Sequence, residues 1–207
     1  MDTMNAPFHN ITVYCGSADD LNPVYHLAAR QLGRELAERK ISLVYGGGKT
    51  GLMGALADSV LSHGGKVLGV VPDSLNQPQL IHAGLSEIEQ APDIQTRQRR
   101  MLELADACIA LPGGLGTYYE LLEALTWAQL GMHAKPVGVL NTAGYFDPLL
   151  VMVEHGINEG FIYPEHHDLL VVAETSNALL DKLAAYTPPA SLARWLTREK
   201  PEPKHDD

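Results

Sequence analysis

The sequence is poor in cysteine and in basic charge, and it has no long apolar run. Two cysteines in 207 residues are too few for the disulfide framework of a small secreted protein. Lysine and arginine number 15 against 25 acidic residues, and the net charge of −10 argues against a nucleic-acid polymer or an anionic membrane as partner. No apolar stretch approaches the ~20 residues that cross a bilayer. The first residues also lack the pattern of a signal peptide, so we expect a soluble cytoplasmic protein.

What the sequence does contain is enough apolar material for a core. Hydrophobic residues make up 45% of the chain and charged residues 19%, which excludes the disordered and fibrous classes. The length fits one domain, and we predict a single unit over 1–207 with a core at about 10–187. Residues 1–9 and the tail from Pro188 are expected to be loosely held. Cys15 and Cys108 lie in apolar runs and are predicted to be buried thiols.

Short apolar runs alternate with longer amphipathic segments. Several runs are apolar at consecutive positions, as in 67–71, which is typical of strands buried on both faces. The alternation predicts a doubly wound, Rossmann-like α/β fold with a mainly parallel sheet and helices on both faces. The expected strands are 10–15, 41–45, 66–71, 107–111, 136–140 and 169–173. The expected helices are about 23–39, 51–63, 94–105, 117–131, about 146–159 and 175–186, with a further short helix at 191–197.

A glycine-rich segment follows the second expected strand and precedes a helix. Gly46, Gly48 and Gly51 match G-x-G-x-x-G, a pattern whose backbone N–H groups approach a phosphate at a helix N-terminus. Asp73 lies beyond it as the acidic residue of a dinucleotide site, so an NAD-dependent oxidoreductase is one alternative. A tight strand-to-helix turn needs the same glycines. A nucleotide-triphosphate P-loop is excluded because Leu43 occupies the position of its first glycine.

Two more glycine turns follow other strands. The segment 112–117, Pro-Gly-Gly-Leu-Gly-Thr, opens a helix, and Gly16-Ser17 follows the first strand. In a doubly wound sheet, the strand ends at the switch point form a crevice that binds ligands. Several anion-binding turns at one crevice indicate a sugar phosphate or a nucleoside monophosphate.

Three arginines stand close together at 97, 99 and 100 in this acidic chain. At about 100° per residue, Arg97 falls between Met101 and Leu104 on the packed side of its helix. Arg99 falls on the opposite face, where solvent is expected, and Arg100 on the flank. Because burying an unpaired guanidinium is costly, Arg97 is predicted to have an anionic partner, either a carboxylate or a substrate phosphate.

Glu120 allows two interpretations. Thr117 and Glu120 have the spacing of a capping box, in which the glutamate bonds back to the start of its own helix. Alternatively, Glu120 is a carboxylate placed beside a phosphate loop, where it contacts a ribose hydroxyl, orients water or stabilises a developing cation. The residues alone leave both open.

These segments together resemble the LOG ("Lonely Guy") family of cytokinin riboside 5′-monophosphate phosphoribohydrolases, whose members were long labelled as lysine decarboxylases. The similarity spans about residues 11–173, and the combination of GGGxxGLMG with PGGxGTxxE is highly specific. The matching segments are 15–17, 43–48, 51–54, 69–72, 106–117 with Glu120, 125–131, 135–137 and 159–161.

The resemblance implies hydrolysis of the N-glycosidic bond of a nucleoside 5′-monophosphate, either AMP or an N6-modified adenosine monophosphate, without metal or cofactor. The family's catalytic pair falls on Arg97 and Glu120. The expected substrate-binding residues are Ser17, Gly46, Gly47, Gly48, Gln79, Gln98, Gly113, Gly114, Gly116, Thr117 and Thr126. Family members are homodimers or larger assemblies, and the helices around 121–130 and 146–157 are candidates for an interface.

Three positions depart from the family pattern. Gln98 replaces the lysine after the family arginine, Tyr119 replaces the acidic residue before Glu120, and Gln79 replaces a substrate-contacting glutamate. A nucleotide-binding or sensing protein that has lost its chemistry is therefore the second hypothesis for function.

Overall fold

The structure is a computed structural model and describes residues 8–190 and 192. The expected short helix at 191–197 and most of the loosely held ends lie outside the described residues. The chain is already held at its first described positions. Phe8 is buried in the core, and the backbone N–H groups of His9 and Asn10 donate to Oδ2 of Asp106 at 2.6 and 2.9 Å. The loose N-terminal segment predicted from the sequence therefore does not extend to residue 9.

The sheet has seven strands, all parallel, in the order β4-β3-β2-β1-β5-β6-β7. The strands are β1 (Asn10–Tyr14), β2 (Ser42–Tyr45), β3 (Val67–Pro72), β4 (Glu87–Ala91), β5 (Ala107–Ala110), β6 (Val137–Leu140) and β7 (Leu170–Ala173). Six of them lie where the sequence predicts strands. Strand β4 was not predicted, and it occupies an edge of the sheet.

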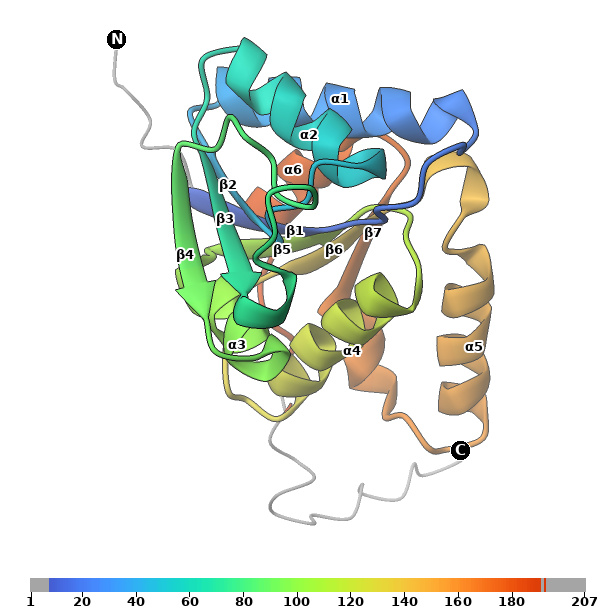
Figure 1. Cartoon of the computed structure of the whole chain (residues 1–207). Helices are drawn as coiled ribbons and strands as arrows, with labels where there is room; N and C mark the ends of the chain where they lie inside the picture. Colours follow the sequence, from blue (N-terminus) through green and yellow to red (C-terminus); the bar gives the residue numbers. More distant parts are fainter. Residues whose placement is uncertain (1–7, 191, 193–207) are drawn as a thin grey trace, which may run out of the picture.

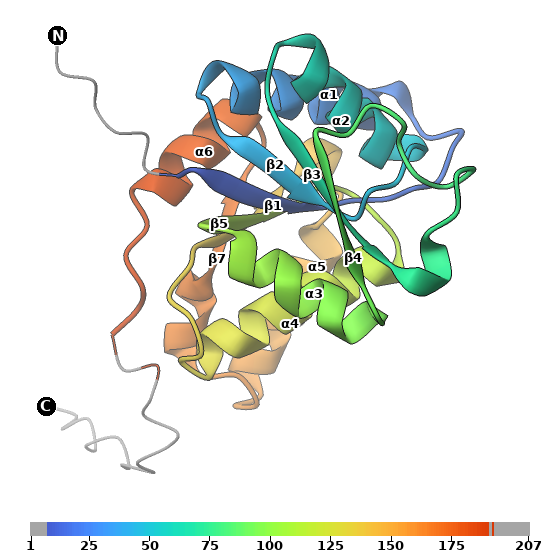
Figure 2. The ribbon, with the colours of Figure 1, turned by 60° about the vertical axis from the view of Figure 1, so that its left-hand side comes forward.

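Helices cover both faces of the sheet. On one face pack α1 (Pro23–Glu38), α2 (Gly51–Ser62) and α6 (Ser176–Ala184). The other face carries α3 (Ile94–Leu104) and α4 (Leu115–Gln129), with α5 (Asp147–Asn158) beside α4. Figure 2 shows the two helical layers with the sheet between them. The predicted doubly wound α/β fold is confirmed. No helix in the described part of the chain is both long enough and apolar enough to span a membrane.

Helix ends follow the local sequence. The side chain of Asn22 accepts a hydrogen bond from the N–H of Val24 at 3.1 Å and caps α1, and Pro23 stands at its first position. Gly64 and Gly131 follow α2 and α4 with φ of 76° and 71°, a left-handed conformation that glycine adopts without steric cost. These signals fix where the helices end, and so where the next strands begin.

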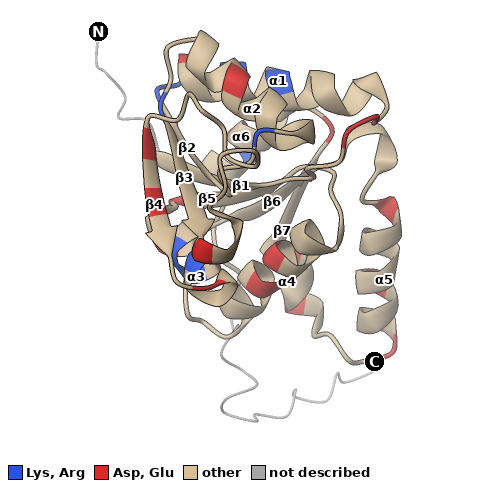
Figure 3. Cartoon of the chain, viewed as in Figure 1, with Lys and Arg blue, Asp and Glu red and all other residues tan. Residues whose placement is uncertain are grey.

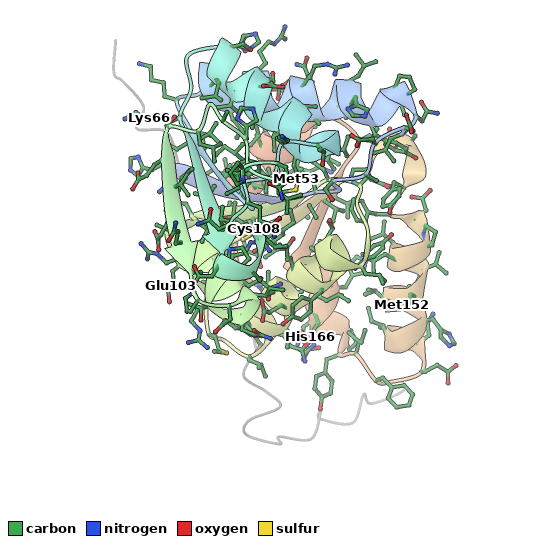
Figure 4. All side chains as sticks on the ribbon, in the orientation of Figure 1. Met53, Lys66, Glu103, Cys108, Met152 and His166 are labelled. Carbon is green, nitrogen blue, oxygen red and sulfur yellow. The ribbon has the colours of Figure 1, made fainter. Side chains whose placement is uncertain are left out.

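The sheet separates two apolar clusters, one under α1, α2 and α6 and the other under α3, α4 and α5. Strands β5 and β6 are buried throughout and β3 at all but one position, as their consecutive apolar residues require. Cys15 and Cys108 are both buried free thiols, as predicted. Figure 4 places Cys108 in the middle of the molecule.

The strand order reverses between β1 and β5. Strand β1 has β2 on one side and β5 on the other, so the connections after β1 and after β5 lead to opposite faces of the sheet. At this switch point the two glycine turns meet, and the N–H of Gly16 donates to the carbonyl oxygen of Pro112 at 3.1 Å. The crevice expected at the carboxyl ends of the strands is therefore lined by Gly16-Ser17 and by the loop of 112–114.

Candidate active site

Arg97 on α3 and Glu120 on α4 form an ion pair between neighbouring helices. Nη1 of Arg97 lies 3.2 Å from Oε1 of Glu120, and the two side chains are only 13% and 9% exposed. Figure 3 shows basic residues on α3 close to acidic residues on α4. The sequence predicts that Arg97 faces inward toward an anion, and the structure identifies the Glu120 carboxylate as that anion.

A backbone oxygen and a glycine hold the Arg97 side chain in place. Its Nε donates to the carbonyl oxygen of Val70 in β3 at 3.1 Å. Gly46, at the end of β2, provides the space for the guanidinium. Arg99 is exposed, as expected, whereas Arg100 pairs with Glu89 at 2.6 Å and Glu103 at 3.4 Å. Only Arg97 among the three is directed at the crevice.

Glu120 does not cap its helix. Helix α4 begins at Leu115 with Gly114 as its N-cap, so Thr117 is the third helical residue and no side chain caps this end. The capping-box interpretation is therefore wrong, because the helix begins earlier than the sequence pattern implies. Burial raises the pKa of Glu120 to about 7, an effect that Arg97 opposes and the nearby charge of Glu123 reinforces. This carboxyl group changes its charge near neutral pH.

The N-terminus of α4 offers unpaired donors beside Glu120. Within the described residues, the N–H groups of Gly114, Leu115, Gly116 and Thr117 have no hydrogen-bond partner. A Cβ on Gly114 or Gly116 would meet no atom within 4 Å, so packing does not require glycine there. The space beside both glycines is open. Free N–H groups and the helix dipole make this end a site for an anion.

A cavity of about 330 Å³ opens against this loop. It is lined by residues of the two glycine turns together with side chains from α1 and from the segment after β6: Gly16, Ser17, Ala18, Leu21, Tyr25, Pro112, Gly113, Gly114 and Tyr145. Glu120 follows Gly116 by one helical turn, which is roughly 6 Å along the axis. The cavity, the free donors and the ion pair thus occupy one end of the sheet.

The 46–51 loop forms the other side of the crevice. Gly47 has φ of 79° and makes the turn after β2, while Gly48 packs against Met53 of α2, which lies near the middle of the molecule (Figure 4). The segment that carries Gln79 lies along this loop. Lys49 N–H donates to Leu80 O at 3.1 Å and His82 N–H to Gly47 O at 2.9 Å. Gln79 itself is exposed and hydrogen-bonds to Gln77.

Two predicted site residues lie apart from the crevice. Gln98 is 3% exposed, and its Oε1 is buried without a hydrogen-bond partner, so it faces the packed side of α3. Thr126 is exposed on α4, where its hydroxyl donates to Leu122 O at 2.6 Å, and it lines a separate cavity between α4 and α5. The structure therefore brings together the glycine turns, Ser17, Thr117, Arg97 and Glu120, but not these two residues.

The sequence analysis missed the aromatic and amide residues that support the loop of 112–117. The hydroxyl of Tyr145 donates to the carbonyl oxygen of Gly113, and the Tyr145 ring stacks on that of Tyr118. Asn141, buried at the end of β6, binds both Asp147 and the N–H of Phe146 at 2.7 Å. A polar residue directly after a buried strand was the available signal for Asn141.

The site contains neither a reactive thiol nor a metal-ligand cluster. Burial raises the pKa of Cys15 far above its ordinary value, and the charge of Glu120 raises it further, so this thiol stays protonated. No group of three or more His, Cys, Asp or Glu in the described residues is arranged to hold a metal ion. The groups that the site brings together are the Glu120 carboxylate, the Arg97 guanidinium, the free backbone N–H groups of α4 and the hydroxyls of Ser17 and Thr117.

Fold and site together define a class: a doubly wound α/β protein with an uncapped helix N-terminus beside a buried ion pair of arginine and glutamate. The sequence profile described as "Possible lysine decarboxylase" matches residues 53–183. Cytokinin riboside 5′-monophosphate phosphoribohydrolase LOG7 of Arabidopsis thaliana is 46% identical over 189 residues, covering 91% of this chain and 87% of the relative. The chain belongs to this LOG family.

Two further comparisons agree on family and fold. The probable cytokinin riboside 5′-monophosphate phosphoribohydrolase LOGL1 of Oryza sativa is 48% identical over 180 residues, covering 87% of this chain and 81% of the relative. The solved molybdenum cofactor binding protein of Rippkaea orientalis has a TM-score of 0.66 at 21% identity, covering 88% of this chain and 98% of that one. At that identity the second likeness supports the fold alone.

Proposed function

We propose that this protein hydrolyses the N-glycosidic bond of a purine nucleoside 5′-monophosphate, AMP or an N6-modified adenosine monophosphate. The oxygen of water bonds to C1′, the bond from C1′ to the base breaks, and the base leaves with the electron pair and takes up a proton. The products are the free base and ribose 5-phosphate. The observation that carries this proposal is the buried Glu120–Arg97 pair one helical turn from the free N–H groups of α4.

The 5′-phosphate binds at the N-terminus of α4. Gly113, Gly114, Gly116 and Thr117 present backbone donors there, and Ser17 reaches the same cavity from the turn after β1. The turn of 46–48 closes the opposite side of the crevice. Together with Arg97, these donors offset the acidic character of the whole chain, because the local field at a helix N-terminus is positive.

Glu120 stabilises the transition state. Cleavage of an N-glycoside builds positive charge on the ribose, and an ionised carboxylate next to C1′ lowers the energy of that state. With a pKa of about 7, the same group also accepts a proton from the attacking water near neutral pH. Its burial makes both effects stronger than they would be in water.

Arg97 has two roles in this proposal. It keeps part of the Glu120 population ionised, and its remaining donors anchor the nucleotide or assist departure of the base. Gln79 approaches the base or ribose from the loop beside Gly48. Gln98 and Thr126 are predicted substrate-binding residues, but both lie apart from the crevice of their own chain. Within one chain they can therefore affect substrate binding only indirectly.

In this proposal the protein acts without a metal or other cofactor, as one α/β unit in the cytoplasm. It forms a homo-oligomer built on dimers. Support for the oligomer comes from an apolar surface on α4, formed by Leu115, Tyr119 and Leu122, with Val151 and Met152 on α5. Figure 4 labels Met152 on that helix. Sedimentation of the wild type against Leu122→Glu and Val151→Glu tests it: both variants should shift to monomer.

The test of function is release of ribose 5-phosphate and free base from a panel of nucleoside 5′-monophosphates, including AMP and isopentenyl-AMP. Activity that depends on Glu120 and Arg97 supports the proposal. Activity unchanged in both Glu120→Ala and Arg97→Ala contradicts the assigned roles. Tight AMP binding without turnover would instead identify a nucleotide-binding protein.

A further inference from the structure

We propose that Tyr145 is a positioning residue of the phosphate loop, whose hydroxyl holds the Gly113 carbonyl so that the Gly114 N–H faces the substrate phosphate. The inference rests on the proposed function, because it assumes that this loop binds a 5′-phosphate. The main observation behind it is the hydrogen bond that the Tyr145 hydroxyl donates to the Gly113 carbonyl oxygen. The ring of Tyr145 also lines the cavity against the loop.

The geometry of the peptide bond links the orientation of the Gly113 carbonyl to that of the Gly114 N–H. The carbonyl of Gly113 and the N–H of Gly114 belong to one planar trans peptide, so they point in opposite directions. Fixing the oxygen toward Tyr145 therefore fixes the hydrogen on the other side. Within the described residues that N–H has no partner, which leaves it available to an anion. Glycines on both sides of this peptide would otherwise let it rotate easily.

The fold holds Tyr145 by a strained turn. Ala143 and Gly144, immediately before it, have φ of 52° and 71°, and the left-handed conformation of Ala143 is uncommon for a residue with a side chain. Asn141 stabilises the turn by accepting from the N–H of Phe146 and donating to Asp147. Backbone strain maintained by a buried amide network is consistent with a turn that must present one side chain accurately.

Aromatic neighbours fix the ring itself. Tyr118 stacks on Tyr145 with an interplanar angle of 9°, while Phe146 and Tyr25 meet it edge-on at centroid distances of 5.1 and 5.8 Å. Tyr118 stands in the first turn of α4, so this stacked pair of rings connects α4 to its own preceding loop.

The experiment compares Tyr145→Phe with the wild type. This change removes the hydroxyl and keeps the ring, so we expect KM for AMP to rise about five- to tenfold, with kcat changed less than twofold. The Kd for AMP and the inhibition constant for inorganic phosphate should rise by the same factor. Affinity for adenosine, which lacks the phosphate, should not change. Tyr118→Phe keeps the ring that stacks on Tyr145, so it should change these constants less than Tyr145→Phe does.

Tyr186→Phe is the matched control, because it removes a hydroxyl beyond α6, far from this loop in sequence, and should leave all constants unchanged. Equal loss of AMP and adenosine affinity in Tyr145→Phe, or a fall in kcat alone, would overturn the inference. So would unchanged phosphate and AMP affinity. If the wild type binds AMP without hydrolysing it, the hydrolase proposal fails while the binding comparison still decides the role of Tyr145. If the wild type binds neither AMP nor phosphate, both proposals fall.

Discussion

Gly46 and Arg97 are fitted to one another: a Cβ on Gly46 would lie 2.1 Å from Nη2 of Arg97. The sequence offered two reasons for this glycine, a tight turn or a phosphate contact. The structure adds a third, which is room for a guanidinium on its way from α3 to Glu120. In the same segment, Gly47 has the left-handed backbone that makes the turn.

Replacing Gly46 by alanine should therefore act through Arg97. We expect the new methyl group to displace the guanidinium from Glu120 and to lower kcat/KM by at least about tenfold, since one charge-assisted contact is worth more than 1.4 kcal/mol. Steady-state kinetics of Gly46→Ala, Arg97→Ala and the double variant measure this. The double variant should be no worse than Arg97→Ala. If the losses in kcat/KM from the two single variants add in the double variant, Gly46→Ala does not act through Arg97.

Removing the charge of Glu120 should remove most of the catalysis. Glu120→Gln keeps the size of the side chain but loses the negative charge, and kcat should fall about 100-fold or more with KM changed little. Glu123→Gln is the matched control, three residues along the same helix and partly exposed, and should retain most of the activity. Comparable losses in the two variants would show that general helix charge, not Glu120, matters.

The pH profile should report Glu120. Since the reactive form is ionised, kcat/KM should fall toward acid pH with an apparent pKa of about 7. Arg97 lowers the pKa of Glu120, so Arg97→Gln should move this limb to higher pH. Carboxyl ¹³C shifts in the free protein measure the titration apart from the substrate phosphate. A limb that stays in place in Arg97→Gln contradicts the assignment.

The free energy of unfolding should depend on pH through Glu120. Burial raises the pKa of Glu120 from its usual 4.5 to about 7, so the folded state binds the proton more tightly than the unfolded state. This contribution is fully present below the unfolded pKa and is lost as the pH rises through 7. From pH 4 to pH 8 the wild type should lose about 3 kcal/mol of unfolding free energy relative to Glu120→Gln. Urea unfolding at both pH values measures it, and a constant difference would contradict it.

Most of the fold follows from local patterns. The six predicted strands are apolar at most positions, and helix ends at Asn22, Gly64 and Gly131 have capping residues that need no tertiary information. Strand β4, with the sequence Glu-Ile-Glu-Gln-Ala, has no such run because it lies at the edge and only Ala91 is buried. Its pairing with β3 is decided by the sheet, not by its own propensity.

The part of the site that depends on helix periodicity could be predicted, because periodicity determines which side of a helix a side chain is on. The inward orientation of Arg97 follows from its spacing to Met101 and Leu104. The helix start before Thr117 could not be located, because Gly114 caps α4 without a side chain and leaves no signature. Nor could the contact of Tyr145 with Gly113, since it joins residues 32 positions apart through a strained turn. Resemblance located Gln98 and Thr126 in the site, whereas packing directs them elsewhere.

Strand β4 gives the acidic excess of this chain a further consequence. Its outer side is a sheet edge, the kind of surface on which another polypeptide can add a strand and begin aggregation. Glu87 and Glu89 lie on that edge, and Glu89 is held by Arg100. A second copy approaching edge to edge would bring the acidic residues of the two copies close together. The acidic residues that leave β4 without an apolar run thus disfavour the addition of a further strand at this edge.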